Sequence, residues 1–254
     1  MDCPTLHGRC LQCGEAERLC SHTWSKAAAA PAPELLKIPE THVTYRQVCK
    51  IFYGGWTGWA PAPPISSIYR IIWTADLHSS FAYYRDMVQS MTGCTDSTRF
   101  RSEKRACNLG EPGSLELCQW PDCHLCKAIR TGFQSSLEYK RSIRGPKGIN
   151  LGRGIYTTPS SYKAYQYAVN IGSADGSNMK AVLSTQVVLG YPFNTNRKDP
   201  RIVAPPPGYH SVIGVPGVPG CCSDFSDPEE VVYDKDAIRP TYLIMLKDSA
   251  DATA

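Results

Sequence analysis

The chain has 254 residues, a formal net charge of +4 and a hydrophobic content of 42%, which allows one full-sized domain with a single core plus a small appendage. The basic bias is weak and unclustered, so nucleic-acid binding is not indicated. No apolar run is long enough for a signal peptide or a transmembrane helix, so we expect an intracellular protein, cytoplasmic or nuclear, without a membrane partner.

Twelve cysteines are many for this length, and close C-x-x-C pairs without a signal peptide favour metal ligation over disulfides. The first group lies in residues 1–25 and comprises Cys10, Cys13, Cys20 and His22. A C-x-x-C pair can direct two thiolates at one tetrahedral ion, although the C-x-H spacing that follows is shorter than usual. This segment predicts a zinc knuckle, with a disordered cysteine-bearing tail as the alternative.

Residues 26–64 predict an Ala/Pro linker, a short helix and a connector rich in Gly, Trp and Pro. The helix is expected within Ile38 to Tyr53, capped by Thr41 or Thr44 and stopped by Gly54-Gly55.

Beyond residue 64, the segment Ile68 to Thr74 predicts a strand because it is β-branched and aromatic. Asp76 is expected to cap the amphipathic helix that follows, and Lys180 to Leu189 alternates as a core strand does.

A second cysteine group contains Cys107, Cys118, Cys123 and Cys126, separated by ten, four and two residues. Four thiolates at these intervals can surround a tetrahedral ion, the last two from a turn that leads into a helix over Leu125 to Phe133. We expect a structural zinc here that clamps a long loop, against two disulfides or free thiols as alternatives.

The stretch Leu151 to Tyr167, LGRGIYTTPSSYKAYQY, reads as a strand, a turn and a helix start that Ser160 or Ser161 would cap. Its glycines, Gly152 and Gly154, would let the backbone approach a ligand closely, and its tyrosines offer faces for a planar ring.

Together with PEEVVYDKDAIRPTYLIML at residues 228–246, this stretch resembles the catalytic domain of the poly(ADP-ribose) polymerase-like (PARP-like) ADP-ribosyltransferases. Tyr156 in G-x-G-I-Y and Tyr167 eleven residues later have the family's spacing. Counting back four residues from Tyr233 places the family's catalytic glutamate at Glu229. The resemblance covers roughly Ile65 to Leu246 and is greatest to the cysteine-containing members associated with fungi.

The resemblance implies an α+β fold over residues 65–247, with two packed, mostly antiparallel sheets and helices around an NAD cleft, followed by a tail at 248–254. NAD would be the substrate, and ADP-ribose would pass to an acceptor, expected to be a protein, by mono- rather than poly-transfer. Tyr156 and Tyr167 would hold the nicotinamide, Gly154 would line the cofactor site, and Glu229 would stabilise the positive charge on the ribose. Because neighbouring strand residues face opposite ways, Glu230 would point away.

The first strand of the NAD site departs from the family. Where members carry a His-Gly pair that binds the ribose and the nicotinamide amide, this chain has Arg101 and Ser102. Arg101 and Ser102 are therefore the expected cofactor-binding residues on this strand. Arginine can donate to a ribose hydroxyl or a phosphate but cannot accept a hydrogen bond, whereas imidazole does both. The alternatives are therefore a catalytically degenerate module that binds NAD or ADP-ribose, and a zinc-dependent interaction or scaffold protein.

Overall fold

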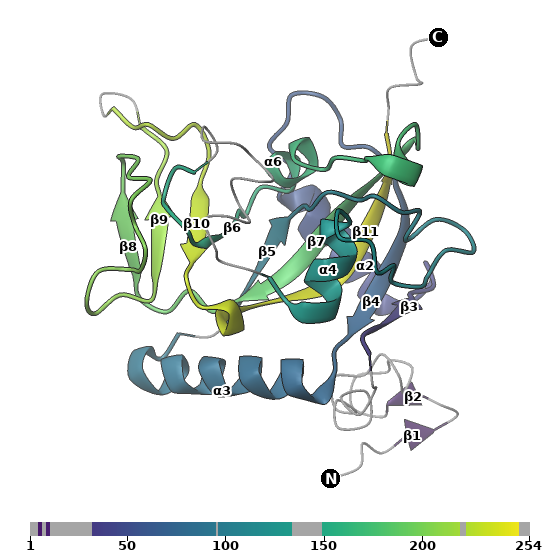
Figure 1. Ribbon diagram of the computed structural model, residues 1–254, viewed down its shortest axis with the longest axis horizontal. Helices are drawn as coiled ribbons and strands as arrows, with labels where there is room; N and C mark the ends of the chain where they lie inside the picture. The colour runs from purple at the N-terminus through teal and green to yellow at the C-terminus, as the bar shows by residue number, and fades with distance from the viewer. Residues whose placement is uncertain are drawn as a thin grey trace.

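A computed structural model describes residues 5–6, 9–10, 32–94, 96–133, 149–218 and 222–248. Its two main sheets form an α+β fold of the predicted class (Figure 1). The first sheet is antiparallel throughout and has the order β3 (Glu34–Lys37), β4 (Ile65–Ile72), β11 (Ile238–Lys247), β7 (Met179–Val187) and β5 (Ser97–Arg101). The second has the order β6 (Ile155–Thr157), β10 (Glu229–Val232), β9 (Ser211–Gly214) and β8 (Pro192–Thr195), with only β8 and β9 parallel. Strand β1 (Thr5–Leu6) pairs antiparallel with β2 (Arg9–Cys10).

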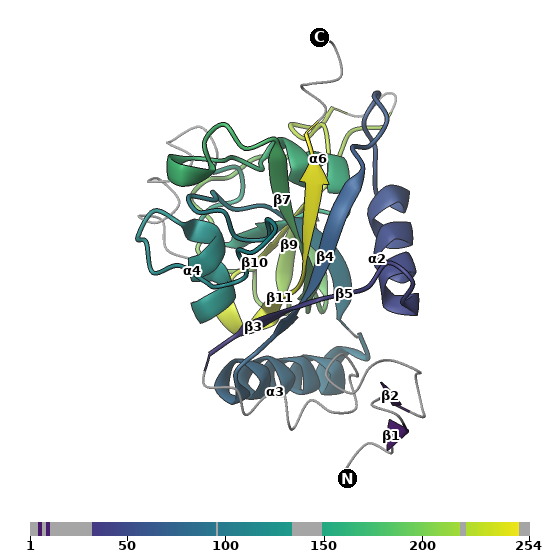
Figure 2. The same cartoon turned by 90° about the vertical axis from the view of Figure 1, so that its right-hand side faces the viewer.

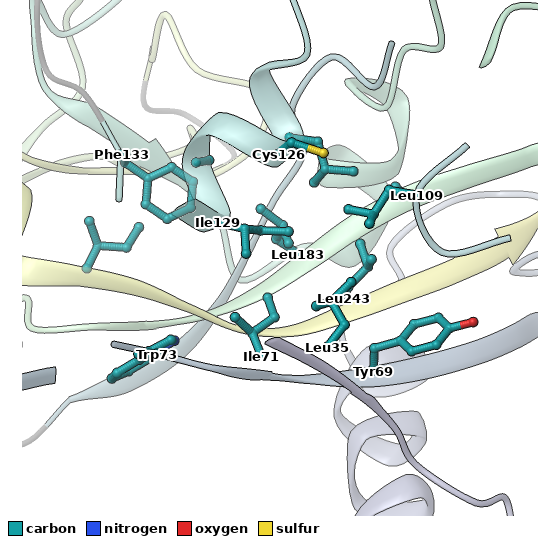
Figure 3. Packing of buried hydrophobic residues seen from close by; sticks show 14 of the residues in the cluster. Leu35, Tyr69, Ile71, Trp73, Leu109, Cys126, Ile129, Phe133, Leu183 and Leu243 are labelled. Atoms are coloured by element: carbon teal, nitrogen blue, oxygen red, sulfur yellow. The ribbon is translucent and has the colours of Figure 1, made fainter. Parts of the chain in front are cut away.

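Helices cover both faces of the five-stranded sheet, because its strands are apolar on each side. Helix α2 (Val43–Gly54) and helix α4 (His124–Thr131) lie on opposite sides of this sheet in Figure 2. Residues Ile68, Val182 and Ile244 share a buried cluster with α2. Their strand neighbours alternate to the other face, where Leu183 and Leu243 lie near Ile129 and Cys126 of α4 (Figure 3).

Helix α3 (Ala75–Thr92) runs along the bottom of the molecule in Figure 1 and joins the core through Phe81, which meets the ring of Trp73 edge-on. No helix in the described part of the chain combines the length and the apolar character needed to cross a bilayer.

The predicted helix caps are wrong at two N-termini, although α2 does end at Gly54 with Gly55 as its C-cap. His42, not Thr41 or Thr44, caps α2, and its ring accepts a hydrogen bond from the Thr44 N–H. Thr74, not Asp76, caps α3. In both helices the cap is the last residue with extended backbone, and Thr44 and Asp76 lie inside the first turn.

Strand β3 and helix α2 lie in residues 26–64, which the sequence analysis placed ahead of the main domain. Both elements nevertheless pack with the sheet of that domain. Strand β3 pairs with β4, with Leu35 opposite Ile71, and Phe52 of α2 is fully buried. Segment 34–54 therefore shares the core of residues 65–247. Other bounds shift by a few residues, since β4 begins at Ile65 and β7 ends at Val187.

The two sheets meet where β5 lies beside the chain that leaves β6. Phe100 N–H donates to the Thr158 carbonyl at 2.8 Å, and Thr158 N–H donates back at 3.1 Å. Helix α6 (Ser161–Gln166) starts directly afterwards, and Ser160 caps it by accepting from the Lys163 N–H. This seam brings the ends of β5, β6 and β10 close to the start of α6.

Candidate active site

A narrow pocket lies at the seam between the sheets, and three residues selected from the sequence, Tyr156, Tyr167 and Glu229, line it together. Its volume is about 30 Å³, roughly the space of one water molecule. Its other lining residues are Phe100, Arg101, Ser102, Thr157, Thr158, Lys163 and Ala164.

Glu229 is the first residue of β10, and its carboxylate is held from two sides. Lys163 donates from Nζ to Oε1 at 3.1 Å, and Asn150 donates from Nδ2 to both carboxylate oxygens at 3.0 Å. Glu230 instead forms an ion pair with Arg99. Of the two adjacent glutamates, Glu229 is thus the one that lines the pocket.

Tyr156 is 7% exposed, and backbone groups fix its hydroxyl. The hydroxyl donates to the Gly152 carbonyl at 2.9 Å and accepts from the Leu151 N–H at 2.8 Å. The same loop receives a hydrogen bond from Tyr233, whose hydroxyl donates to the Leu151 carbonyl at 2.7 Å. Burial raises the pKa of Tyr233, so this hydroxyl keeps the proton that it donates. Tyr156 is therefore a rigid wall of the pocket.

Tyr167 forms a second, more exposed wall of the same pocket. It is the C-cap residue of α6 and is 46% exposed. It also lines a second pocket described below, so its side chain stands where the two pockets meet.

The two glycines of the G-x-G motif make close contact with protein rather than with the pocket. Gly152 has a φ of +68°, and a Cβ there would lie 1.7 Å from the Ile202 carbonyl oxygen. A Cβ on Gly154 would lie 2.0 Å from Val231 Cγ1. Gly154 was expected in the cofactor site, but it does not line the pocket, because its missing side chain is what lets the loop pack on β10.

Arg101 ends β5 and is 8% exposed, with its guanidinium engaged by the protein itself. It pairs with Glu103 at 2.6 Å, donates to the Tyr156 carbonyl at 2.6 Å and lies over the Phe133 ring at 5.1 Å. Arg101 thus ties β5 to β6 at the pocket wall. The next residue, Ser102, is 5% exposed and lines the pocket.

A second, polar pocket of about 270 Å³ adjoins the first and shares Glu229, Lys163 and Tyr167 with it. Its remaining lining residues are Asn150, Gln166, Lys198, Asp224, Phe225, Ser226 and Asp227. Glu229 therefore faces a narrow pocket with aromatic walls and a wider polar one.

Lys163 and Asn150 are the site residues that sequence reasoning missed. A signal existed for Lys163, because residues four apart share a helix face and Tyr167 follows it by four. Asn150 carries no comparable signal, since its partner Glu229 is 79 residues away in the sequence.

The second cysteine group forms a cluster on the face of the core that α4 covers. The Sγ atoms of Cys107, Cys118, Cys123 and Cys126 all lie within 4.8 Å of one another. The Cys107 sulfur is 3.6 Å from that of Cys123 and 3.5 Å from that of Cys126. Zinc–sulfur bonds of about 2.3 Å in a tetrahedron place sulfurs roughly 3.8 Å apart, so these four could hold a metal ion.

Hydrogen bonds among the thiols set their acidity. The hydrogen bonds that Cys123 forms with Cys107 and Cys126 lower the pKa of the Cys123 thiol. The hydrogen bond between Cys107 and Cys123 raises the pKa of the Cys107 thiol to about 11. Thiolate formation is therefore easiest at Cys123.

The N-terminal group cannot be placed in the same way. Cys13, Cys20 and His22 lie outside the described residues, and only the backbone of Cys10 is described, in β2. The zinc knuckle at residues 1–25 stays a prediction.

Part of the chain is similar to two curated proteins. It is 38% identical over 95 residues to the mouse protein mono-ADP-ribosyltransferase PARP4, covering 37% of this chain and 5% of that protein. The human PARP4 protein is 34% identical over 102 residues, covering 40% of this chain and 6% of that protein. The chain thus spans about a twentieth of the length of these relatives. No protein-family model matches it.

These similarities support a PARP-like ADP-ribosyltransferase in general. The α+β architecture with two mostly antiparallel sheets is compatible with a PARP-like fold.

Proposed function

We propose that this chain is an NAD-dependent mono-ADP-ribosyltransferase that passes ADP-ribose from NAD to an acceptor, expected to be a protein, and releases nicotinamide. The observation that carries the proposal is one carboxylate, Glu229, that lines a pocket with Tyr156 and Tyr167 while Lys163 and Asn150 hold it. The partial similarity to mono-ADP-ribosyltransferases supports the same reaction class.

In this reaction the bond between the ribose C1′ and the nicotinamide nitrogen breaks, and its electron pair leaves with the ring. Positive charge develops on C1′ and the ribose ring oxygen, and an acceptor nucleophile then bonds to C1′ and loses its proton. Glu229 would accept a hydrogen bond from a ribose hydroxyl and stabilise this charge. The contacts from Lys163 and Asn150 would hold the carboxylate in one orientation without reorganisation.

The nicotinamide ring would enter the narrow pocket between Tyr156 and Tyr167. The present volume of about 30 Å³ is too small for a ring, so a wall must move. Tyr156 is anchored through its hydroxyl, whereas Tyr167 is 46% exposed at the end of a short helix. Tyr167 would therefore swing outward and close on the ring.

The polar pocket is the side from which we expect the acceptor to reach Glu229. It meets the narrow pocket at Glu229, Lys163 and Tyr167 and has about nine times its volume, 270 against 30 Å³. A side chain of a protein acceptor would fit there, beside the carboxylate that guides its proton.

We also propose that Cys107, Cys118, Cys123 and Cys126 hold a structural zinc ion, in line with the separation of their sulfurs. The ion would brace the loop from Cys107 to α4. Just after α4, the Phe133 ring lies against Arg101 at the pocket wall. The zinc ion would stabilise the fold and would take no part in breaking the bond between ribose and nicotinamide. The N-terminal group would hold a second zinc.

The test is transfer of label from ADP-ribose-labelled NAD to the chain itself or to added proteins, with Glu229→Gln and Glu230→Gln compared. We expect Glu229→Gln to abolish labelling. Glu230→Gln makes the same chemical change at the next residue but removes the ion pair to Arg99, so labelling should persist. Full labelling by Glu229→Gln would refute the assigned role.

The alternatives make different predictions in the same assay. NAD binding in calorimetry without any labelling would establish a binding module. If the chain shows neither NAD binding nor labelling, the interpretation that remains is a scaffold protein.

A further inference from the structure

One carboxylate that lines the polar pocket has no cationic partner in the described part of the chain. Asp227 is half-buried, and its carboxylate accepts a hydrogen bond from the neighbouring Ser226 hydroxyl at 3.0 Å. No Lys, Arg or His side chain among the described residues lies within ion-pair distance of it. A carboxylate that is partly removed from water gains from a cationic partner, so an unpaired one in a pocket points to a cationic ligand.

The other two carboxylates that line this pocket already have donors. Glu229 is held as described above. Asp224 accepts hydrogen bonds from the Lys198 N–H at 2.9 Å and from Arg197 Nη1 at 3.4 Å. Asp227 is therefore the carboxylate of the polar pocket that is left for a bound molecule.

The balance of charge in the pocket favours a cation over an anion. Three carboxylates and two ammonium groups line it. Of the two lysines, Lys163 pairs with Glu229, and the Lys198 ammonium lies over the Phe225 ring at 6.0 Å. An acidic acceptor could approach Lys198, but it would also meet the uncompensated charge of Asp227.

Asp227 is fixed close to the carboxylate that we assign to the reaction. Lys163 Nζ donates to the Asp227 carbonyl at 3.3 Å and to Glu229 Oε1 at 3.1 Å. One ammonium group thus holds the backbone of Asp227 and the carboxylate of Glu229 near each other, and both residues line the polar pocket. A side chain that pairs with Asp227 would therefore lie beside Glu229.

The acceptor must then combine a positive charge with a nucleophilic atom. A lysine side chain has a single nitrogen, which cannot pair with Asp227 as an ammonium and attack a carbon atom as well. A guanidinium has three nitrogens in one plane, so it can donate two parallel N–H bonds to a carboxylate and keep a third nitrogen free. A serine hydroxyl or a carboxylate would bring no charge for Asp227.

We infer that the acceptor is an arginine side chain whose guanidinium binds Asp227, an inference that rests on the proposed function. In the transfer, a guanidinium nitrogen bonds to the ribose C1′ while the bond from C1′ to nicotinamide breaks, and the electron pair of that bond leaves with the ring. The attacking nitrogen loses one proton to the Glu229 carboxylate, which passes it to water. The substituted guanidinium keeps its positive charge, so Asp227 pairs with both the substrate and the product.

Transfer of label from ADP-ribose-labelled NAD to agmatine tests the acceptor class with the full chain. Agmatine carries the guanidinium of arginine, whereas cadaverine carries the ammonium of lysine. Wild-type protein should label agmatine at least about tenfold faster than cadaverine. In proteins that the chain labels, mass spectrometry should find the ADP-ribose on arginine.

Substitution of Asp227 tests its role in binding the acceptor. Asp227→Asn should raise the KM for agmatine about tenfold with a smaller change in kcat, and Asp227→Glu should recover part of the loss. Asp96→Asn is the matched control, because Asp96 is also half-buried and without an ion pair in the described chain, but it precedes β5 and lines neither pocket. Its KM for agmatine should equal that of the wild type. Lys198→Met should lower this KM, because it removes a like charge from the pocket.

The results that would overturn the inference differ from those that would overturn the proposed function. If the wild type releases nicotinamide and labels proteins but agmatine accepts no label, or if Asp227→Asn leaves the KM for agmatine unchanged, the acceptor inference is wrong and the proposed function stands. Labelling on Asp or Glu side chains that Lys198→Met abolishes would show that the pocket selects acids. If the wild type neither releases nicotinamide from NAD nor labels any protein, the proposed function fails and the inference fails with it.

Discussion

Lys163 Nζ lies 3.1 Å from Glu229 Oε1, and the side chains of both residues are only 11% exposed. The same ammonium group donates to the Asp227 carbonyl at 3.3 Å. One lysine in α6 therefore holds both the start of β10 and the carboxylate that β10 presents to the pocket. A buried ion pair of this kind is costly to break from one side only, because the remaining charge loses its compensation.

Replacing Lys163 should damage turnover more than substrate binding. In Lys163→Met only Asn150 would orient the Glu229 carboxylate, so we expect kcat for ADP-ribose transfer to fall by about a hundredfold, with a much smaller change in KM for NAD. Lys163→Arg should recover part of kcat because it restores the positive charge. Steady-state kinetics with NAD measures both quantities.

Lys180→Met is the control for this prediction. Lys180 also pairs with a carboxylate, Asp248 at 3.0 Å, but it does not line either pocket. The kcat of the Lys180→Met variant for ADP-ribose transfer should remain near the wild-type value. A Lys163→Met enzyme with unchanged kcat would show that the ion pair does not orient Glu229 for the reaction.

Arg101→His should destabilise the protein rather than repair its site. Glu103 is 4% exposed and pairs with Arg101, so shortening that side chain leaves a buried carboxylate uncompensated. We expect the free energy of unfolding to fall by about 3 kcal/mol in urea denaturation. Adding Glu103→Gln should recover most of the loss, because it removes the unpaired charge.

The exposed pair of Arg85 and Asp86 provides the comparison, since Arg85→His should change stability by less than about 1 kcal/mol. An Arg101→His protein of normal stability with raised turnover would mean that Arg101 impairs the native site and has no structural role.

Removal of the proposed zinc ion from the cysteine cluster beside α4 should destabilise the chain. Cys126 is fully buried, so Cys126→Ser should lower both the zinc content and the melting temperature. Cys222→Ser is matched in chemistry, but Cys222 is exposed and outside the cluster, so neither quantity should change. Elemental analysis and thermal melts, with and without a chelator, measure the effect. Metal-free protein that melts like the wild type would remove the proposed zinc site.

Gly154→Ala should be destabilising for reasons of packing. Its Cβ would lie 2.0 Å from Val231 Cγ1 and 2.9 Å from the Val232 carbonyl oxygen. We expect a loss of about 1–3 kcal/mol in the free energy of unfolding, partly relieved by Val231→Ala in the same chain. Gly54→Ala meets no atom within 4 Å and should be nearly neutral. Equal stability of the two glycine variants would contradict the packing role.

Much of the local structure follows from the sequence. Alternation in Glu229–Val232 predicts that adjacent glutamates face opposite ways, and the structure has Glu229 at the pocket and Glu230 on Arg99. Ser160 was one of two predicted caps for α6, and it is the one that caps it. The intervals of the second cysteine group predicted one cluster, and its four sulfurs lie together. These features depend on spacing within a short segment, which the chain itself specifies.

Other features depended on tertiary structure. The sequence allowed Arg101 to be a ligand-binding group, but packing places its guanidinium between Glu103, Phe133 and the Tyr156 carbonyl. Gly154 looked like a ligand contact, and its neighbour is Val231. Asn150 and Lys163 became site residues only because β10 lies beside β6 and α6.

The sequence by itself determined the cysteine cluster and the opposite orientation of Glu229 and Glu230, because spacing and alternation act over a few neighbours, while the class of fold and the choice of Glu229 came from the resemblance of its motifs to a family. Only the tertiary structure decided what holds Glu229 and which polar groups of the site are already paired within the protein. Those properties arise from contacts between residues tens of positions apart, and no local pattern encodes them.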